Sequence, residues 1–187
     1  MSYVFGSISS AIIVCRLAGL DDPRSKGSKN PGATNVLRLG GKKYALLTLT
    51  GDVLKGVIPV LIAKHLELSE LTIALTMLFA FLGHLYPVFF GFIGGKGVAT
   101  AFGVIFAAYW VLGAISLLIW LVIAAIFRYS SLAGLVAFIL AAPISVWLGL
   151  NNYISISLLI ISLFQIYRHQ DNIQKLIQGK ESKIGKK

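Results

Sequence analysis

Six long apolar blocks constrain this chain more than any other feature of its sequence. A helix needs about 20 mainly apolar residues to cross the hydrocarbon core of a bilayer, which is roughly 30 Å thick. The blocks span residues 3–20, 44–64, 70–92, 98–127, 131–149 and 152–167. Because 57% of the residues are hydrophobic and only 13% are charged, most of the chain has lipid as its solvent. The sequence therefore predicts an all-α protein, a polytopic bundle of helices embedded in a membrane.

The positive charge of the chain is gathered in two segments that flank apolar blocks. The formal net charge is +10, and the basic residues concentrate in residues 24–43 and 168–187. This distribution is typical of cytoplasmic segments that face anionic lipid headgroups. Nucleic acid is not expected as a partner, since no recognised nucleic-acid motif accompanies the charge. The first charge, Arg16, follows the first apolar stretch, so the N-terminus lacks the basic region of a cleavable signal peptide.

The charges of the connecting segments predict the topology. Residues 21–43 carry six Lys or Arg, as does the C-terminal tail, so both should be cytoplasmic and the N-terminus outside. An even number of crossings must then separate the glycine-rich segment 91–97 from the tail. Only three blocks remain, and block 98–127 would make a helix of about 45 Å, long for one crossing. We therefore expect a break near Gly113 that gives about seven crossings and a cytoplasmic C-terminus. The alternative is one tilted long helix with residues 152–167 re-entrant.

Residues 27–38 form the first polar constellation, GSKNPGATNVLR. Its glycines permit positive φ and close backbone approach, so that consecutive N–H groups can form a nest for an anion. Neutral hydrogen-bonding groups and one guanidinium accompany them, in Ser28, Asn30, Thr34, Asn35 and Arg38. Arg38 can grip a phosphate with two hydrogen bonds. The alternative is an ordinary cytoplasmic turn with a helix N-cap at Thr34 or Asn35.

Residues 83–100 form the second constellation, in which Gly94, Gly95 and Gly97 surround Lys96 directly before an apolar block. A glycine loop that leads into a helix N-terminus favours an anion, because backbone donors and the helix dipole point at it. The segment is not a Walker A loop, since Phe90 and Gly97 stand where that motif needs a glycine and a Ser or Thr. The alternative is that the glycines only permit close packing of helices.

Other polar groups stand inside or beside the apolar blocks. Asp52 and Lys55 share one face of a helix, and they form either an internal pair that stabilises the bundle or part of a substrate site. His84 lies inside a predicted span and is a weak candidate for a general base. Arg128 is expected at an interface, where its side chain can snorkel. Taken by itself, the tail from Arg168 is typical of a solvated, amphipathic surface helix.

Four runs together resemble a known family. GSKNPGATNVLR, GHLYPVFFGFIGGKGVAT, RYSSL and RHQDNI, in this order and spacing, resemble the bacterial acyl-phosphate-dependent glycerol-3-phosphate acyltransferases. The resemblance runs from Gly6 to Gly185, and its first two motifs are long and specific. Many members have proline where this chain has Ile8 or Ser9, which leaves the shape of the first helix open.

The resemblance implies one membrane-embedded acyltransferase domain over residues 1–187, a multi-pass protein of the bacterial plasma (inner) membrane. Segments 21–43 and 91–100 would be cytoplasmic active-site loops, and residues 168–187 a cytoplasmic tail. The enzyme would move an acyl chain from acyl phosphate to the 1-hydroxyl of glycerol 3-phosphate. The products are phosphate and 1-acylglycerol 3-phosphate (lysophosphatidic acid), an intermediate of phospholipid biosynthesis. Membrane lipid and the enzyme that makes acyl phosphate are the implied partners. No cofactor or metal is implied.

The resemblance also implies roles for individual residues. Ser28, Arg38, Lys96 and His169 would be catalytic, with His84 the weakest candidate. The residues that bind substrate or its phosphate would be Ser28, Asn30, Gly32, Thr34, Asn35, Arg38, Gly94, Gly95, Lys96, Gly97, Ser130, Ser131, His169 and Asn172. The general base stays open between His84, His169 and the substrate's own phosphate, of which we prefer the phosphate.

Two other classes of function compete with an acyltransferase. Interrupted apolar segments and intramembrane charges would suit a small transporter for a phosphorylated metabolite. Against it, the chain shows no repeated half, and its polar motifs collect on one side of the membrane instead of at the midplane. A non-catalytic membrane scaffold would leave the clustered phosphate-type donors without a purpose.

Overall fold

The computed structural model describes residues 1–185, which fold into helices and connecting turns without a β-strand. This confirms the predicted all-α class. The helices in chain order are α1 (Ser2–Gly6), α2 (Ser10–Leu17), α3 (Ala33–Gly40), α4 (Lys42–His65), α5 (Glu70–Leu85), the 3-10 helix η1 (Val88–Phe90), α6 (Val98–Ala108), α7 (Trp110–Phe127), α8 (Ser130–Trp147), α9 (Asn152–Arg168) and α10 (Gln170–Ile177).

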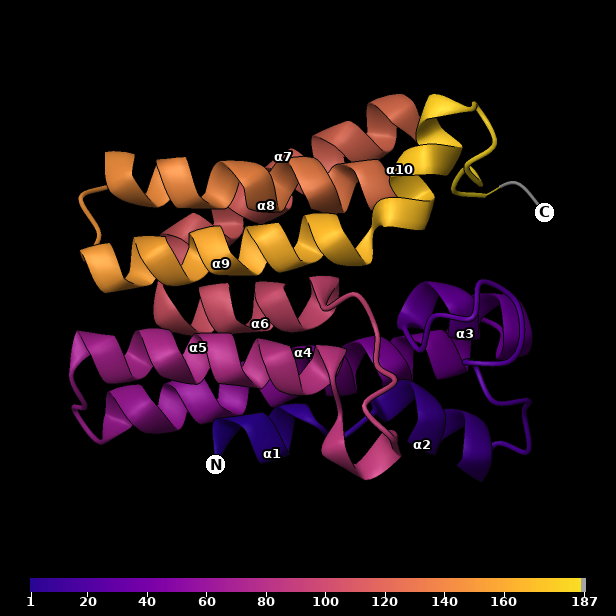
Figure 1. The fold of residues 1–187 in the computed structure, drawn as a ribbon, viewed down its shortest axis with the longest axis horizontal. Helices are drawn as coiled ribbons and strands as arrows, with labels where there is room; N and C mark the ends of the chain where they lie inside the picture. Colours follow the sequence, from indigo (N-terminus) through magenta and orange to yellow (C-terminus); the bar gives the residue numbers. More distant parts are fainter. Residues whose placement is uncertain (186–187) are drawn as a thin grey trace.

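Four helical segments in the described part of the chain are long and apolar enough to cross a membrane by length and composition. They are α4, α5 extended through η1 to Phe90, α7 and α8. The shorter helices α6 and α9, of 11 and 17 residues, lie alongside them in the bundle (Figure 1).

The connections of the bundle separate into two ends (Figure 1). Helix α3, the segment between η1 and α6, and α10 with the tail gather at one end, on the right of the figure. The turns from α4 to α5 and from α8 to α9 lie at the opposite end. Both glycine-containing motifs and the basic tail therefore meet at one end, which we call the loop end.

Helices α4 and α6 approach so closely that their backbones touch. A Cβ added to Gly56 would lie 2.5 Å from the Thr100 carbonyl oxygen, and one added to Gly103 would collide with the carbonyl oxygen of Val53. The buried Thr100 hydroxyl donates to the Asp52 carbonyl across this contact, at 2.9 Å. Small residues allow such packing in membranes, where apolar burial between helices gives little driving force. Because α6 begins directly after the Lys96 loop, the contact with α4 fixes the position of that loop.

The block 98–127 is broken, as predicted, but at Tyr109 and not near Gly113. Tyr109 is extended, with φ −144° and ψ 94°, and it separates α6 from α7. Lys64 of α4 donates to the carbonyls of Ala107 (3.3 Å) and Ala108 (2.8 Å), and the Tyr109 hydroxyl donates to Glu70 of α5 at 2.9 Å. The alternative of one long helix is wrong. Side chains of α4 and α5 satisfy the helix end, and they determine where the break occurs.

Gly113 has a packing role that its sequence position did not reveal. A Cβ at this residue would lie 2.7 Å from the ring of Phe106 and 3.0 Å from its Cα. The glycine therefore allows the first turn of α7 to lie against α6 after the chain reverses.

The first apolar block was expected to be one helix over residues 3–20, and this expectation is wrong. The chain forms α1 and α2 with a break between Ser7 and Ser9. The Lys55 ammonium of α4 donates to the Ile8 carbonyl at 2.9 Å, so the break has a buried donor from another helix. Helix α1 packs closely on α5, since a Cβ on Gly6 would meet the Ala80 carbonyl. The third block also ends early, because α5 stops at Leu85 and not at residue 92.

The close approach of α4 and α6 leads to a matched prediction on two helical glycines. Gly103→Ala should lower the free energy of unfolding by about 1–3 kcal/mol, because its Cβ meets backbone and the helices must separate. Gly134→Ala on α8 should be neutral or stabilising by up to about 1 kcal/mol, since alanine is the better helix former and its Cβ meets only the two Val98 methyl groups, at 3.3 and 3.7 Å. Thermal unfolding in one lipid or detergent system compares the two variants. Equal stability of the variants would contradict the close backbone contact.

Candidate active site

The buried side chain of Asn35 holds the loop before α3, which we call the first loop, in its conformation. Its side chain is fully buried, and its amide nitrogen donates to the carbonyls of Pro23 (2.8 Å) and Lys26 (3.0 Å). Its amide oxygen accepts from the Ser28 backbone N–H at 2.9 Å. Gly27 lies against the same amide with φ +62°, where a Cβ would collide with it. The asparagine therefore fixes a loop that has no regular structure of its own.

Neither Thr34 nor Asn35 is the N-cap of the following helix. Helix α3 begins at Ala33, and Gly32 occupies the N-cap position. Thr34 and Arg38 are exposed on this helix, and their side chains make no hydrogen bond within residues 1–185. The Ser28 hydroxyl is likewise exposed and unbonded in that range. The groups predicted to contact a phosphate are thus accessible, whereas Asn35 is already engaged.

The glycine loop before α6 is held by α5 and α9. The Gly95 N–H donates to the His84 carbonyl at 3.2 Å. The Arg168 guanidinium donates to the carbonyls of Gly94 (2.7 Å) and Gly95 (3.2 Å). Gly97 has φ +82°, and a Cβ there would also collide with the ring of Phe81. The carbonyl groups of Gly94 and Gly95 are therefore occupied, and the first N–H groups of α6 remain as donors at its N-terminus.

The two predicted motifs are neighbours in space. A Cβ added to Gly95 would lie 3.0 Å from the Pro31 carbonyl oxygen of the first loop. A second contact joins the same segments, because Arg24 donates to the Phe90 carbonyl at 2.9 Å. Arg24 also pairs with Asp22 at 2.7 Å and lowers the pKa of that carboxyl group by hydrogen bonding. Residues 64 and 66 positions apart in the sequence thus form one surface.

A chain of four polar side chains crosses the loop end. The Lys96 ammonium donates to the Asn172 amide oxygen, and the Asn172 amide nitrogen donates to Glu181 at 2.7 Å. The Ser131 hydroxyl donates to the same Glu181 oxygen at 2.6 Å. Three residues predicted to bind substrate therefore converge, and Ser130 begins α8 beside them. Sequence reasoning missed Glu181, although a carboxylate within a basic tail was a usable signal.

The tail folds back onto the start of α8. The Ile184 N–H donates to the Arg128 carbonyl at 2.6 Å, and the Arg128 guanidinium donates to the Ile184 carbonyl at 2.9 Å. Lys183 lies over the ring of Tyr129, 5.6 Å from its centre. Arg128 thus holds the tail in place, which is a role in addition to the snorkelling at an interface that was expected of it. The tail is also more than a solvated surface helix, because these contacts carry Glu181 to the chain of polar groups.

His169 lies at the junction of α9 and α10 and is 2% exposed. Its Nδ1 donates to the Gln165 carbonyl at 2.7 Å, which leaves Nε2 as an acceptor. Burial lowers the pKa of His169 to about 4, so the ring is neutral at physiological pH. One turn earlier, the side-chain amide of Gln165 is 1% exposed and has no hydrogen-bond partner within residues 1–185. Sequence reasoning did not single out this buried polar group.

Asp52, Lys55 and His84 form a buried cluster beneath the glycine loop. The Lys55 ammonium pairs with the Asp52 carboxylate at 2.9 Å, and His84 Nδ1 lies 3.6 Å from the same oxygen. The other side of the His84 ring faces Gly95, where a Cβ would strike Nε2. The cluster therefore supports the loop from within the bundle. No group of three His, Cys, Asp or Glu suited to a metal ion occurs among the described residues.

Comparisons with known proteins agree on one family. The profile of the family described as glycerol-3-phosphate acyltransferase matches residues 1–179. The glycerol-3-phosphate acyltransferase of Methylococcus capsulatus is 54% identical over 187 residues, covering 100% of this chain and 94% of the relative. That of Burkholderia cenocepacia is 53% identical, covering 100% and 89%.

Two solved structures have the same fold as this chain. Both are crystal structures of PlsY (YgiH), an integral membrane glycerol 3-phosphate acyltransferase. The glycerol 3-phosphate form superposes with a TM-score of 0.94 at 44% identity, covering 98% of this chain and 92% of that one. The lysophosphatidic acid form gives a TM-score of 0.91 at 43% identity, with the same coverage.

The central place of Asn35 in the first loop leads to a testable prediction. Asn35→Asp keeps an acceptor but loses both donated hydrogen bonds, which leaves the carbonyls of Pro23 and Lys26 facing a carboxylate. Loss of such buried partners costs about 1–3 kcal/mol, so trypsin should cleave after Lys26 about 5- to 150-fold faster when cleavage follows local opening. Thr34→Ala is the control, because the Thr34 side chain makes no hydrogen bond there. Cleavage rates that are the same in both variants would show that Asn35 does not hold the loop.

Proposed function

Because this chain belongs to the glycerol-3-phosphate acyltransferase family, we propose that it transfers an acyl chain from acyl phosphate to the 1-hydroxyl of glycerol 3-phosphate. The products are 1-acylglycerol 3-phosphate (lysophosphatidic acid) and inorganic phosphate. The observation that carries the proposal is the convergence of Lys96, Asn172 and Ser131 beside the loop that leads into α3, the helix on which Arg38 lies. Two anionic substrates need two adjacent groups of donors, and the loop end supplies both.

We assign the two groups of donors to the two phosphates. The donors around α3, with Ser28, Asn30, Gly32, Thr34 and Arg38, would hold one phosphate. The glycine loop with Lys96, together with Ser130, Ser131, His169 and Asn172, would hold the other and close over the glycerol. Asn35 acts by holding its loop, since its amide atoms are already bonded. Lys96 would then exchange its bond to Asn172 for one to a phosphate oxygen.

The proposed chemistry is direct acyl transfer. The glycerol 1-hydroxyl oxygen attacks the carbonyl carbon of acyl phosphate, and the tetrahedral oxyanion collapses with loss of phosphate. The donor is a mixed anhydride and already activated, so the protein need not form an acyl-enzyme. Positioning and charge stabilisation supply most of the acceleration. Lys96, Arg38 and the N–H groups at the start of α6 would stabilise the oxyanion and the departing phosphate.

The hydroxyl proton goes to a phosphate of the substrates in this mechanism. A general base works best when its pKa lies near the operating pH. The pKa of His169 is about 4 in the free enzyme, which makes its Nε2 a weak base at neutral pH. The second ionisation of a phosphate monoester lies at about pH 6, which suits the task better. His169 then serves as a hydrogen-bonding group at the site and not as the base.

We also propose the topology that the charges predict. Starting outside, the chain would cross the bacterial inner membrane seven times, with α1 and α2 together as the first crossing and α4 to α9 as the other six. The loop end is then cytoplasmic, where glycerol 3-phosphate and the enzyme that makes acyl phosphate are available. Gathering of the polar motifs at this end also disfavours a transporter (Figure 1), since a transport site belongs near the midplane.

Phosphate release by the purified protein in lipid tests the function. Release from acyl phosphate should require glycerol 3-phosphate, and Arg38→Ala and Lys96→Ala should each lower kcat about 100- to 1000-fold, as the loss of an oxyanion-stabilising donor does. Lys29→Ala is the control, because Lys29 is an exposed cation of the loop before α3 and is given no role. Folded protein that releases no phosphate with both substrates present would contradict the acyltransferase and favour uptake assays.

The pH dependence of the reaction tests the assignment of the base. Activity should fall as the pH drops through about 6, because the substrate phosphate gains its second proton there. Replacing glycerol 3-phosphate by its methylene phosphonate, which ionises at higher pH, should move this acid limb upward. His169→Gln should lower kcat without moving it. An acid limb that disappears in His169→Gln would assign the base to His169.

A further inference from the structure

The connection between α5 and the glycine loop is apolar where its neighbours are polar. Its exposed side chains are Val88 (41%), Phe89 (60%), Phe92 (57%) and Ile93 (58%). We call residues 88–93 the aromatic turn. At the same end of the bundle, the segment 21–30 is polar and charged except for Pro23 and Gly27. Large apolar side chains rarely gather on a surface that faces water. The two exposed phenylalanines at this end therefore indicate contact with something other than water.

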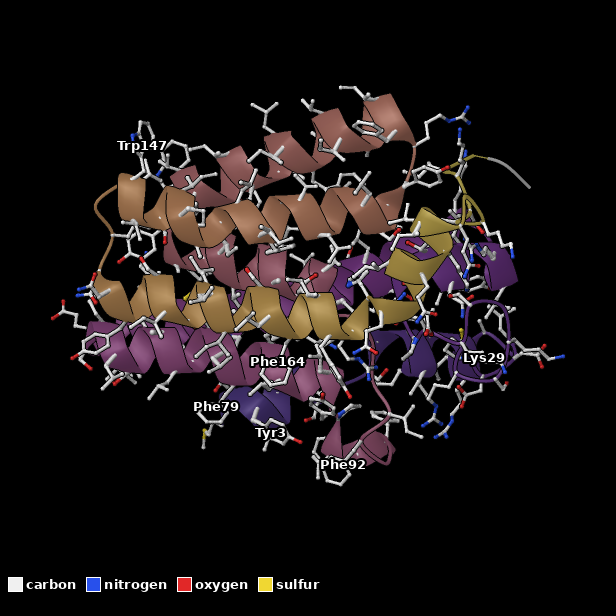
Figure 2. The ribbon with its side chains drawn as sticks, turned by 45° about the horizontal axis from the view of Figure 1, so that its top comes forward. Tyr3, Lys29, Phe79, Phe92, Trp147 and Phe164 are labelled. Carbon is white, nitrogen blue, oxygen red and sulfur yellow. The ribbon has the colours of Figure 1, made fainter. Side chains whose placement is uncertain are left out.

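The aromatic turn has a defined shape. The N–H groups of Phe90 (3.1 Å) and Phe92 (3.0 Å) both donate to the Pro87 carbonyl, and Arg24 donates to the Phe90 carbonyl at 2.9 Å. Gly91 and Phe92 are both left-handed, with φ +67° and +59°. A non-glycine residue rarely adopts this conformation. The strained backbone at Phe92 keeps its ring outside the bundle, where Figure 2 shows it.

Helix length places the turn at the surface of the hydrocarbon. Helix α5 has 16 residues and is about 24 Å long, which is less than the roughly 30 Å of the hydrocarbon core. Extended through η1, the segment Glu70–Phe90 has 21 residues and contains an 18-residue stretch with a mean hydropathy of 1.9, which suffices to cross. The residues that follow Leu85 therefore complete the crossing and lie near the boundary with the headgroups.

The glycine loop lies deeper than a connecting loop usually does. Gly95 is bonded to the carbonyl of His84, so it lies level with the last turn of α5. Helix α6 has only 11 residues, about 17 Å by its rise per residue. Its far end is level with the start of α5, as the bond from Tyr109 to Glu70 shows. The glycine loop at the N-terminus of α6 consequently lies within the bundle, beside the aromatic turn.

The turn also projects on a side of the bundle that faces lipid. In Figure 2 the labelled residues Tyr3 and Phe79 lie along the same lower side of the bundle as Phe92. Phe79 is 44% exposed in the middle of α5, which is the pattern of a helix face in contact with acyl chains. Aromatic side chains are enriched at the interface between hydrocarbon and headgroups.

We propose that the aromatic turn inserts into the interfacial layer of the cytoplasmic leaflet and sets the depth of the glycine loop. The partner of this surface is the lipid bilayer itself. The consequence for the donor rests on the function proposed above. In acyl phosphate the reactive carbonyl is attached directly to the acyl chain. A glycine loop at the depth of the interfacial layer can therefore contact the carbonyl while the acyl chain stays among the lipid chains. A protein partner on the same surface is the competing outcome.

Spin labels measure the depth of the turn without any activity assay. In a Cys15→Ala background, nitroxides would be placed by Phe79→Cys, Phe92→Cys and Lys29→Cys in protein reconstituted in vesicles with 30% anionic lipid. Collision with oxygen, which concentrates in hydrocarbon, and with a water-soluble nickel chelate is then compared. The label at 92 should favour oxygen, between the lipid-exposed label at 79 and the aqueous label at 29. Nickel access at 92 equal to that at 29 would overturn the proposal and leave the turn for a protein partner.

Kinetics test the consequence for the donor. The double variant Phe89→Ser/Phe92→Ser should raise KM for long-chain acyl phosphate in vesicles about tenfold, as expected for the loss of aromatic side chains from an apolar layer. KM for glycerol 3-phosphate and for a water-soluble short-chain acyl phosphate should not change, and Phe89→Trp/Phe92→Trp should keep the original values. An unchanged long-chain KM in the serine variant would overturn the link to the donor. If the protein transfers no acyl group at all, the proposed function fails, and the label at 92 still decides the depth.

Discussion

Hydrocarbon offers no hydrogen-bond partner to a broken backbone, and the structure depends on how this constraint is met. Every interruption of a helix inside a bilayer leaves carbonyl groups that the protein itself must satisfy. Here side chains from other helices do so at three breaks. Lys55 reaches Ile8 between α1 and α2, and Lys64 reaches the end of α6. Arg168 reaches the two glycine carbonyls before α6. Placing a cation inside an apolar bundle costs free energy, but these cations bind the carbonyl groups that the helix breaks leave without a partner.

These breaks create the candidate site. Because α6 is short and begins late, the glycine loop lies level with His84 in the last turn of α5 and not above the bundle. Small residues let α4 and α6 touch, so the loop cannot rise without separating two backbones. The first loop is brought to Gly95 through Pro31, and Asn35 holds its conformation from the buried side. For the proposed transfer from acyl phosphate, such a position brings polar groups to the depth at which we place the carbonyl of the donor.

Several predictions from sequence were confirmed, and their errors have a common cause. Long apolar blocks indicate helices, because hydrophobic length depends on local composition alone, and the motifs around Arg38 and Lys96 do meet at one end. The break in block 98–127 followed from its length, yet its position moved from Gly113 to Tyr109. A glycine, which has no Cβ, is as compatible with close packing of helices as with a helix break. In this block, contacts from Lys64 and Glu70 of other helices determined the position of the break. The break at Ser7 to Ser9 depended likewise on Lys55.

The sequence by itself determined the class of the protein: an all-helical membrane chain with two cationic, glycine-containing motifs and the motif order of one acyltransferase family. Tertiary structure alone decided which groups face one another. Glu181 joins Ser131 and Asn172 only because the tail folds back on Arg128. Asn35 turns into the loop instead of capping a helix. The physical reason is that composition and periodicity are local quantities, whereas a hydrogen bond between residues 50 or more positions apart exists only once the helices between them have packed.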